Sequence, residues 1–155
     1  MIDSLKAQIL DWKYGREIIK NFITELSDSD LDKPFPRKNL NSIRKQCEEL
    51  IQVQSCYVEA LESKQIQFNY EPLNDVSKDG LTAKMNALDD KLEKILEQFN
   101  GCEKIMWFGE AWNIHQHISA MIGHEQMHIG QIIAFCYATG IHIPDNITNI
   151  MSLDG

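Results

Sequence analysis

Two histidines four residues apart are the side chains of this sequence best suited to chemistry. His124 and His128 lie in a long apolar run, from Asn113 to about Gly140, that contains no proline. If this run is helical, the two rings lie one turn apart on one face, where two imidazoles can bind one transition metal ion. The alternative is a pair of core histidines, each with a hydrogen-bond partner. The spacing alone leaves both interpretations open.

The same five residues match HExxH, the motif of zinc proteases in which a glutamate acts as general base. Here that glutamate is Glu125, about 100° around the helix from His124. It could support a metal site through contact with one of the ligands, without binding the ion itself, or simply face another helix. A protease also needs a third ligand downstream, and the only histidine after His128 is His142, beyond Gly140. The sequence therefore disfavours a protease.

Three further helices, predicted from apolar residues at helical spacing, must position any site on the last one. The first runs from Asp3 to about Leu31 and stops before a segment with two prolines; Gly15 interrupts its apolar stripe, where another helix could come close. The second begins at Asn41 or Ser42, either of which suits an N-cap, and runs to about Lys64. The third spans about Leu81 to Phe99. Its outer face is predicted to be solvated and carries Asp89, Asp90, Lys91, Glu93, Lys94 and Glu97.

The remaining connections carry few strand signals. The apolar segment KIMWFGE, residues 104–110, is predicted to be a short extended crossover leading to the last helix, which Asn113 can cap. Four long helices without strands predict an all-α chain folded as a four-helix bundle, with a single domain over residues 1–155.

A third metal ligand has to come from another helix, because catalytic metal sites usually have three protein ligands and an open position. Periodicity offers Gln46, Glu49 and Gln54 on the second helix and does not choose among them. His117, seven residues before His124, points the same way but lies roughly 10 Å along the axis. It suits a supporting or pocket-lining position better than a share in the same ion.

Composition excludes several classes of protein. The 155 residues are 43% hydrophobic and 25% charged, with a net charge of −8. Because Lys and Arg supply most affinity for phosphate backbones, this acidic chain is not expected to bind nucleic acid. No apolar stretch is long enough to span a bilayer and the N-terminus is not a signal peptide, so we expect a cytoplasmic protein without membrane contact. Its four cysteines lack CxxC spacing and are expected to be reduced, buried apolar groups: Cys47, Cys56, Cys102 and Cys136.

The sequence resembles the DinB/YfiT-like (DNA-damage-inducible) superfamily, whose members are metal-binding four-helix bundles, commonly dimeric. The most specific match is HEQMHIGQI, followed by an apolar turn and TGIHIP at 139–144, which looks like the last helix of that family. LDWKY at 10–14 and the segment from Asn39 to Leu61 extend the resemblance over nearly the whole chain.

The resemblance implies a divalent metal held by three histidines, one from the second helix and two from the last. The two late ligands fall on His124 and His128. The first falls on Glu49, and no histidine precedes His115, so either Glu49 supplies a carboxylate or the site has decayed. Two histidines and a carboxylate suit zinc or nickel, and also iron or manganese.

Members of the superfamily that the sequence resembles include enzymes that use low-molecular-weight thiols, in which the metal activates a thiolate. The resemblance therefore implies a metal-dependent thiol S-transferase, or a related hydrolase, acting on a small molecule. Gln131 and His117 could line its pocket, while Trp107 and Phe108 could form an apolar wall or pack in the core. The alternative is a non-catalytic, dimeric stress-response protein with a vacant or structural metal site. The apolar last helix has little polar surface, which also predicts a homodimer.

Overall fold

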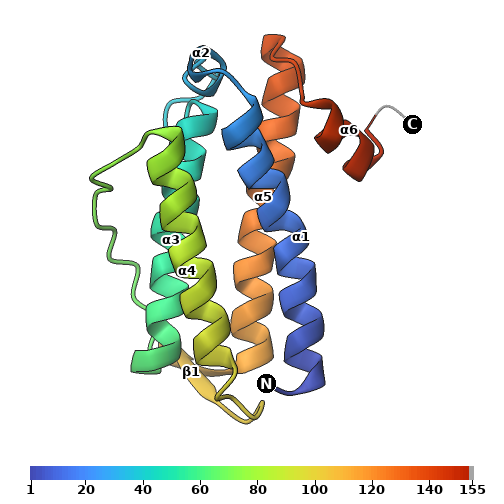
Figure 1. Cartoon of the computed structure of the whole chain (residues 1–155). Coiled ribbons are helices and arrows are strands. Elements are labelled where there is room, and N and C mark those ends of the chain that lie inside the picture. The colour runs from blue at the N-terminus through green and yellow to red at the C-terminus, as the bar shows by residue number, and fades with distance from the viewer. Residues whose placement is uncertain (154–155) are drawn as a thin grey trace.

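Four long helices form the body of the protein in this computed structural model, which describes residues 1–153. They are α1 (Asp3–Glu25), α3 (Ile43–Ser63), α4 (Lys78–Leu96) and α5 (Ile114–Thr139). Two short helices, α2 (Asp28–Leu31) and α6 (Asp145–Met151), lie at one end, and a hairpin of β1 (Lys104–Trp107) and β2 (Glu110–Asn113) lies at the other (Figure 1). The prediction of a predominantly helical chain is confirmed.

The long helices contact one another in a closed ring, α1 with α5, α5 with α3, α3 with α4, and α4 with α1. Residues 64–77 form a long loop that returns along the outside of the helices, so that α3 and α4 run in the same direction (Figure 1). α1 and α5 run the opposite way. This arrangement places α3 directly beside α5, the helix that carries both histidines.

Two of the predicted helix boundaries are wrong because serine side chains cap new helices at Ser27 and Ser77. The expected helix from Asp3 to Leu31 is interrupted at Leu26, whose ψ of 150° is extended, and the Ser27 side chain accepts the Asp30 N–H to start α2. Similarly, Ser77 accepts the backbone N–H of Gly80, so α4 begins at Lys78, three residues before the predicted start. An N-cap serine satisfies an N–H that the first turn leaves without a partner.

The expected crossover at residues 104–110 is a hairpin. β1 and β2 pair antiparallel, with Lys104 opposite Asn113, and the turn falls on Phe108 and Gly109, with φ of 46° and 95°. Two consecutive positive φ values characterise the tight turn that matches strand twist. The Phe108 side chain at this turn is 79% exposed.

The core consists of two apolar clusters, separated along the helix axes by a polar layer. On α1, for example, Trp12 belongs to one cluster and Ile18 to the other. Each long helix contributes one buried polar side chain between the clusters: Arg16, Gln54, Asp89 and Glu125. Asp89 was predicted to face solvent. It is instead 7% exposed and lies 3.4 Å from Arg16 and 2.7 Å from Lys20.

The close approach expected at Gly15 is confirmed, because a Cβ atom there would lie 2.5 Å from Gln126 Nε2 on α5. Three of the cysteines are buried and free as expected, but Cys102 is exposed. Among the helices of residues 1–153, none has both the length and the apolar character that crossing a membrane requires.

Candidate metal site

α5 holds the two histidines in a fixed relation because it is unbroken from end to end. The Asn113 side chain accepts the Gln116 N–H and the Gln116 side chain accepts the Asn113 N–H, a reciprocal cap that begins the helix. Gly140, with φ of 67°, ends it. Between these ends His124 and His128 stay one turn apart, with ring centroids separated by 4.7 Å.

Glu49 on α3 faces both rings. Its Oε2 lies 2.9 Å from His128 Nε2, and its Oε1 lies 3.4 Å from His124 Nε2. One ligand atom from each residue falls within 4.8 Å of the others. Such separations suit one ion with donors at about 2.0–2.2 Å. The structure therefore brings these three residues together as a possible metal-binding site.

Gln46, one turn before Glu49, fixes the protonation of His128. It is fully buried, and its Oε1 lies 3.0 Å from His128 Nδ1. An amide oxygen only accepts, so Nδ1 must carry the proton and, in the neutral ring, Nε2 presents a lone pair toward Glu49. A hydrogen bond that orients a metal-binding imidazole in this way is a usual feature of metal sites.

The facing atoms of Glu49 and His128 need a cation between them. Glu49 Oε2 is buried and, among residues 1–153, no donor makes a hydrogen bond to it, although His128 Nε2 is close. A carboxylate oxygen and an imidazole lone pair repel each other, and a buried oxygen without a partner is costly. A proton on Nε2, which makes the contact an ion pair and lowers the pKa of Glu49, or a metal ion bound by both atoms would remove this repulsion. On this ground the residues present fit a divalent metal ion.

The electrostatics keep the carboxylate ready to bind. Burial raises the pKa of Glu49, but His124 and His128 outweigh burial and lower the pKa to about 2. The group is therefore ionised at neutral pH, as a metal ligand must be. The side chains of Glu49 and His124 are 22% and 21% exposed, whereas His128 is 2% exposed. The site thus lies at the surface of the packed helices, with His128 on the side of the site that faces the protein interior.

Gln54 and Glu125 belong to the polar layer instead of this site. Gln54 accepts a hydrogen bond from Arg16 Nη2 at 2.6 Å and donates to Asp89 at 3.0 Å. Glu125 accepts from Trp12 Nε1 at 3.0 Å and lies 3.1 Å from Arg16. Burial raises the pKa of Glu125, although Arg16 and Trp12 oppose the rise. The glutamate of HExxH therefore anchors α5 to α1 and is not one of the three residues that form the possible metal site.

His117 is a satisfied core histidine. Its Nδ1 accepts from Trp107 Nε1 and its Nε2 donates to the Tyr57 carbonyl, each at 3.0 Å. Burial lowers its pKa to about 4, against a smaller opposing effect of the Tyr57 carbonyl. The expectation that His117 lines a pocket is wrong, because both ring nitrogens are occupied inside the core. His142, beyond α5, lies on the surface near Asp145.

An aromatic surface lies close enough to the site for its tyrosines to be affected by the charge of Glu49. Burial and the Glu49 charge raise the pKa of Tyr70, and burial, Tyr70 and Glu49 raise that of Tyr57 to about 12. Phe68 contacts both tyrosines, and Phe108 stacks on Phe68 with ring centroids 6.2 Å apart. Trp107, in contrast, is 9% exposed and stacks on Trp112 in the core. Of the two predicted wall residues, only Phe108 lies on the surface.

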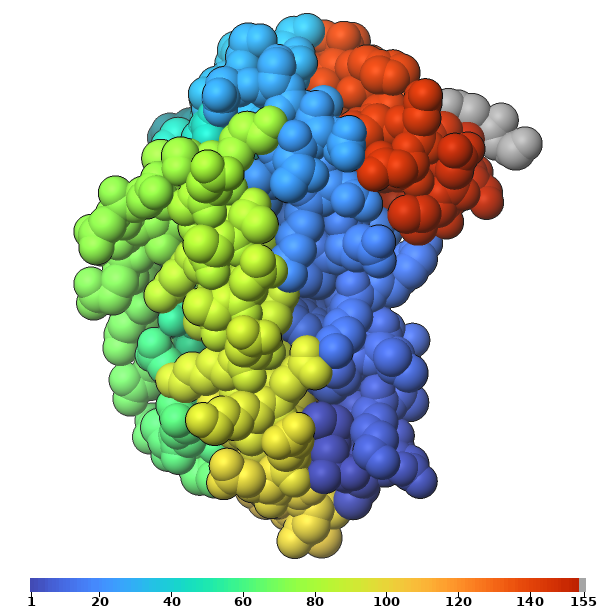
Figure 2. Space-filling view, viewed as in Figure 1, coloured from blue at the N-terminus to red at the C-terminus, as the bar shows by residue number. Residues whose placement is uncertain are grey.

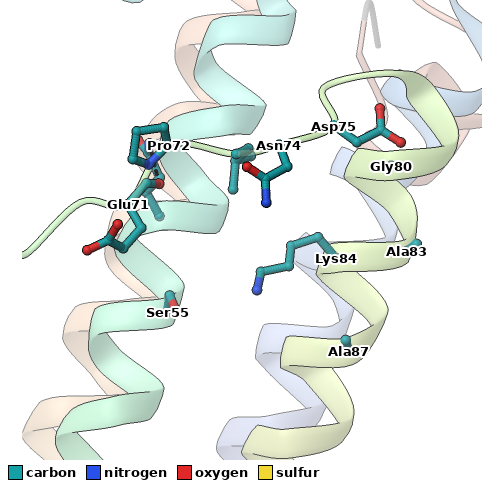
Figure 3. Close-up of a pocket in the computed structure, with 11 residues that line it drawn as sticks. Ser55, Glu71, Pro72, Asn74, Asp75, Gly80, Ala83, Lys84 and Ala87 are labelled. Carbon is teal, nitrogen blue, oxygen red and sulfur yellow. Dashed lines mark hydrogen bonds between the residues drawn. The ribbon is translucent and has the colours of Figure 1, made fainter.

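Two cavities lie elsewhere. One of about 700 Å³ is bounded by α3, residues 71–75 and α4, with Lys84 extending across its opening (Figure 3). Another, of about 530 Å³, opens between α1 and α4 on the face shown in Figure 2, with Arg16 and Asp89 in its lining. Neither is lined by Glu49, His124 or His128.

Comparison with known proteins adds no assignment: no family model matches the chain, and no curated protein is similar to it.

The residues that support the site were only partly predictable from the sequence. The spacing of apolar residues offered Gln46 as a possible third metal ligand, whereas in the structure it is a hydrogen-bond partner of His128. That hydrogen bond depends on how α3 is rotated. The Arg16 layer was not predicted, although an arginine four residues after Trp12 on an otherwise apolar stripe was a usable signal.

Proposed function

We propose that the chain is a DinB/YfiT-like, metal-dependent enzyme, a thiol S-transferase or related hydrolase, whose Glu49, His124 and His128 hold a divalent metal ion. The observation that carries the proposal is the convergence of three donors from α3 and α5, one of them a buried carboxylate oxygen without a hydrogen-bond donor. Zinc or nickel, and then iron or manganese, suit a set of two imidazoles and one carboxylate.

The helix arrangement supports the proposed family. The ligands come from the second and the last of the four long helices, as the resemblance implies, and the long helices close into a ring around one core. We further propose a four-helix bundle of the DinB/YfiT type that functions as a homodimer.

The residues around the ligands have separate tasks. A bound divalent ion would polarise a substrate atom or lower the pKa of a water or thiol. Gln46 keeps the proton of His128 on Nδ1, which leaves the lone pair of Nε2 available to bind the metal ion. Glu125, held by Trp12 and Arg16, fixes the rotation of α5 and so aims the histidines at α3. The partly exposed edges of Glu49 and His124 leave a side from which a small molecule can approach.

Metal content tests the proposal directly. Protein purified without added metal is expected to contain one divalent ion per chain by elemental analysis. Glu49→Ala should lower metal affinity by at least tenfold, because it removes the only carboxylate of the set. Glu48→Ala is the matched control, since it removes an equal charge from the adjacent position on α3. Equal metal affinity in Glu49→Ala and the parent would remove Glu49 from the site.

Activity requires a second measurement. The metal-loaded protein is expected to consume a low-molecular-weight thiol in the presence of a small electrophile, and to lose this activity with a chelator. Bacillithiol, mycothiol, glutathione and coenzyme A would be compared as thiols. Retained metal with no consumption of any of them would refute the transferase.

One observation favours a second candidate, a non-catalytic stress-response protein with a structural metal. The cavities of about 700 and 530 Å³ are lined by residues other than the three ligands. A metal that raises the thermal stability, in a protein without thiol or hydrolase activity, would support this candidate.

A further inference from the structure

Arg37 is the arginine that forms no ion pair with a carboxylate of residues 1–153. The chain has 23 acidic side chains and only three arginines. Arg16 lies 3.4 Å from Asp89 and 3.1 Å from Glu125, and Arg44 lies within 2.7 Å of two aspartates. No carboxylate of residues 1–153 forms an ion pair with Arg37, which is only partly exposed. In so acidic a chain, an arginine left without an anion is a candidate for binding one from outside.

The segment that carries Arg37 is fixed against α5. Phe35 is 3% exposed and stacks on Phe135, with ring centroids 4.6 Å apart and an interplanar angle of 21°. The Phe35 N–H also donates to the Asn41 carbonyl at 2.6 Å, which closes the loop around Arg37. A guanidinium on an anchored backbone loses little freedom when it binds a ligand.

A hydrogen bond directs the Arg37 side chain to the face of α5 that carries the histidines. Arg37 Nη1 donates to Gln131 Oε1 at 2.7 Å. Gln131 follows His128 by three residues and His124 by seven, so it lies on their face, about 4.5 Å and 10 Å further along the axis. The guanidinium therefore lies on the same face of α5 as the two histidines, about one to two turns beyond them, on the side away from the aromatic surface of Tyr70 and Phe68.

We propose that Arg37 binds the oxyanion group, a carboxylate or phosphate, of the small molecule that the Glu49, His124 and His128 site acts on; this inference rests on the proposed function. With Nη1 held by Gln131, the guanidinium keeps further N–H groups for a bidentate contact with two oxygens. Arginine suits this recognition because its donors form a planar fork. The substrate or the thiol then carries an anion at one end, and its reacting atom lies at the metal ligands, about one to two helix turns away along α5.

The competing explanation is that Arg37 only ties residues 32–42 to α5. The two explanations differ in what removal of the charge does. If Arg37 is only a tether, removing its charge lowers the stability of the protein and leaves anion binding unchanged. If Arg37 is an anion site, removing its charge abolishes or weakens anion binding.

Side-chain NMR separates them in the full chain, labelled with ¹⁵N and freed of metal with a chelator. Succinate and inorganic phosphate are the probes, titrated separately, and the Arg37 Nε–H and Gln131 amide signals are followed. We expect saturable shifts of both signals with at least one probe. Tighter binding of succinate identifies a carboxylate ligand, and tighter binding of phosphate a phosphorylated one.

Variants make the assignment specific, with binding of the preferred probe followed by calorimetry. Arg37→Gln is expected to weaken binding at least tenfold. Lys38→Gln, which removes the same charge from the next, exposed residue, should stay within twofold of the parent. Equal binding by Arg37→Gln and the parent would overturn the proposal. So would the absence of saturable shifts in the parent, together with a lower melting temperature for Arg37→Gln, because that result shows a tether only.

Metal content, measured on the same samples, keeps this inference separate from the proposed function. Arg37→Gln should retain one ion per chain, since it removes no ligand. A parent protein that binds metal but shows no Arg37-dependent anion binding contradicts the anion site alone. A parent protein that binds no metal contradicts the proposed function, and also the proposal that Arg37 binds a substrate of the metal site.

Discussion

Replacing Gln46 by leucine tests whether the buried amide serves the metal site or only the fold. The variant removes the acceptor 3.0 Å from His128 Nδ1 and puts an apolar side chain of similar volume at a fully buried position. Hydrogen-bond partners of metal-binding histidines typically contribute about 10- to 100-fold to metal affinity. This range corresponds to about 1.4–2.8 kcal/mol of binding free energy.

The stability of the metal-free protein should change much less. Loss of one neutral hydrogen bond costs about 1 kcal/mol. Gln46 Nε2 is itself buried without a partner among residues 1–153, and leucine removes that cost as well. The two effects oppose each other, so we expect the free energy of unfolding to change by about 1 kcal/mol or less. A large loss of metal affinity with little loss of stability is the expected signature.

Gln54→Leu is the matched control, on the same helix and also buried. It removes hydrogen bonds to Arg16 and Asp89, so it should lower the unfolding free energy by about 2–4 kcal/mol and leave metal affinity unchanged. Zinc affinity is measured by competition with a chromogenic chelator, and stability by urea unfolding in EDTA. Zinc binding by Gln46→Leu as tight as that of the parent, or an equal loss of zinc affinity in both variants, would show that Gln46 does not serve the metal site.

Three further outcomes follow from the same structure. Arg16→Met should lower the free energy of unfolding by about 3–5 kcal/mol in urea titrations, because Asp89 and Glu125 lose their buried partner; a loss below 1 kcal/mol would show that the layer is hydrated. In the folded protein the pKa of His117 is lowered from 6.5 to about 4, so as the pH falls the imidazole is protonated in the unfolded chain before it is protonated in the folded one. The free energy of unfolding should therefore be highest above about pH 6.5 and fall by on the order of 3 kcal/mol as the pH approaches 4. His117→Gln should lack this part of the pH dependence in urea titrations at successive pH values, and an unchanged slope would contradict the assignment. The protein is expected to be a homodimer, with about twice the chain mass of 17.9 kDa by light scattering; a monomer mass at micromolar concentration would exclude it.

Part of the fold follows from local sequence. The spacing of apolar residues, the prolines after Leu31 and the caps at Ser42, Asn113 and Gly140 predicted four long helices, which are present. These signals act within one or two turns, so they can be read without knowing what packs against them. The hairpin was missed because its turn places Phe108 at a positive φ, which residue type rarely indicates.

The histidine pair was also determined locally. His124 and His128 share a face wherever α5 is placed, since their relation depends only on helix geometry. The resemblance to DinB/YfiT-like proteins, and not periodicity, selected Glu49 as their partner.

Only the tertiary structure decided which side chains meet. Gln46, Glu49 and Gln54 lie close together on α3, and the rotation of that helix sends the first two toward α5 and the third to Arg16. That rotation is set by packing of whole helix faces, a sum of many small contacts between residues far apart in sequence. For the same reason the burial of Asp89 and the placement of Arg37 beside Gln131 could not be read from the residues around them.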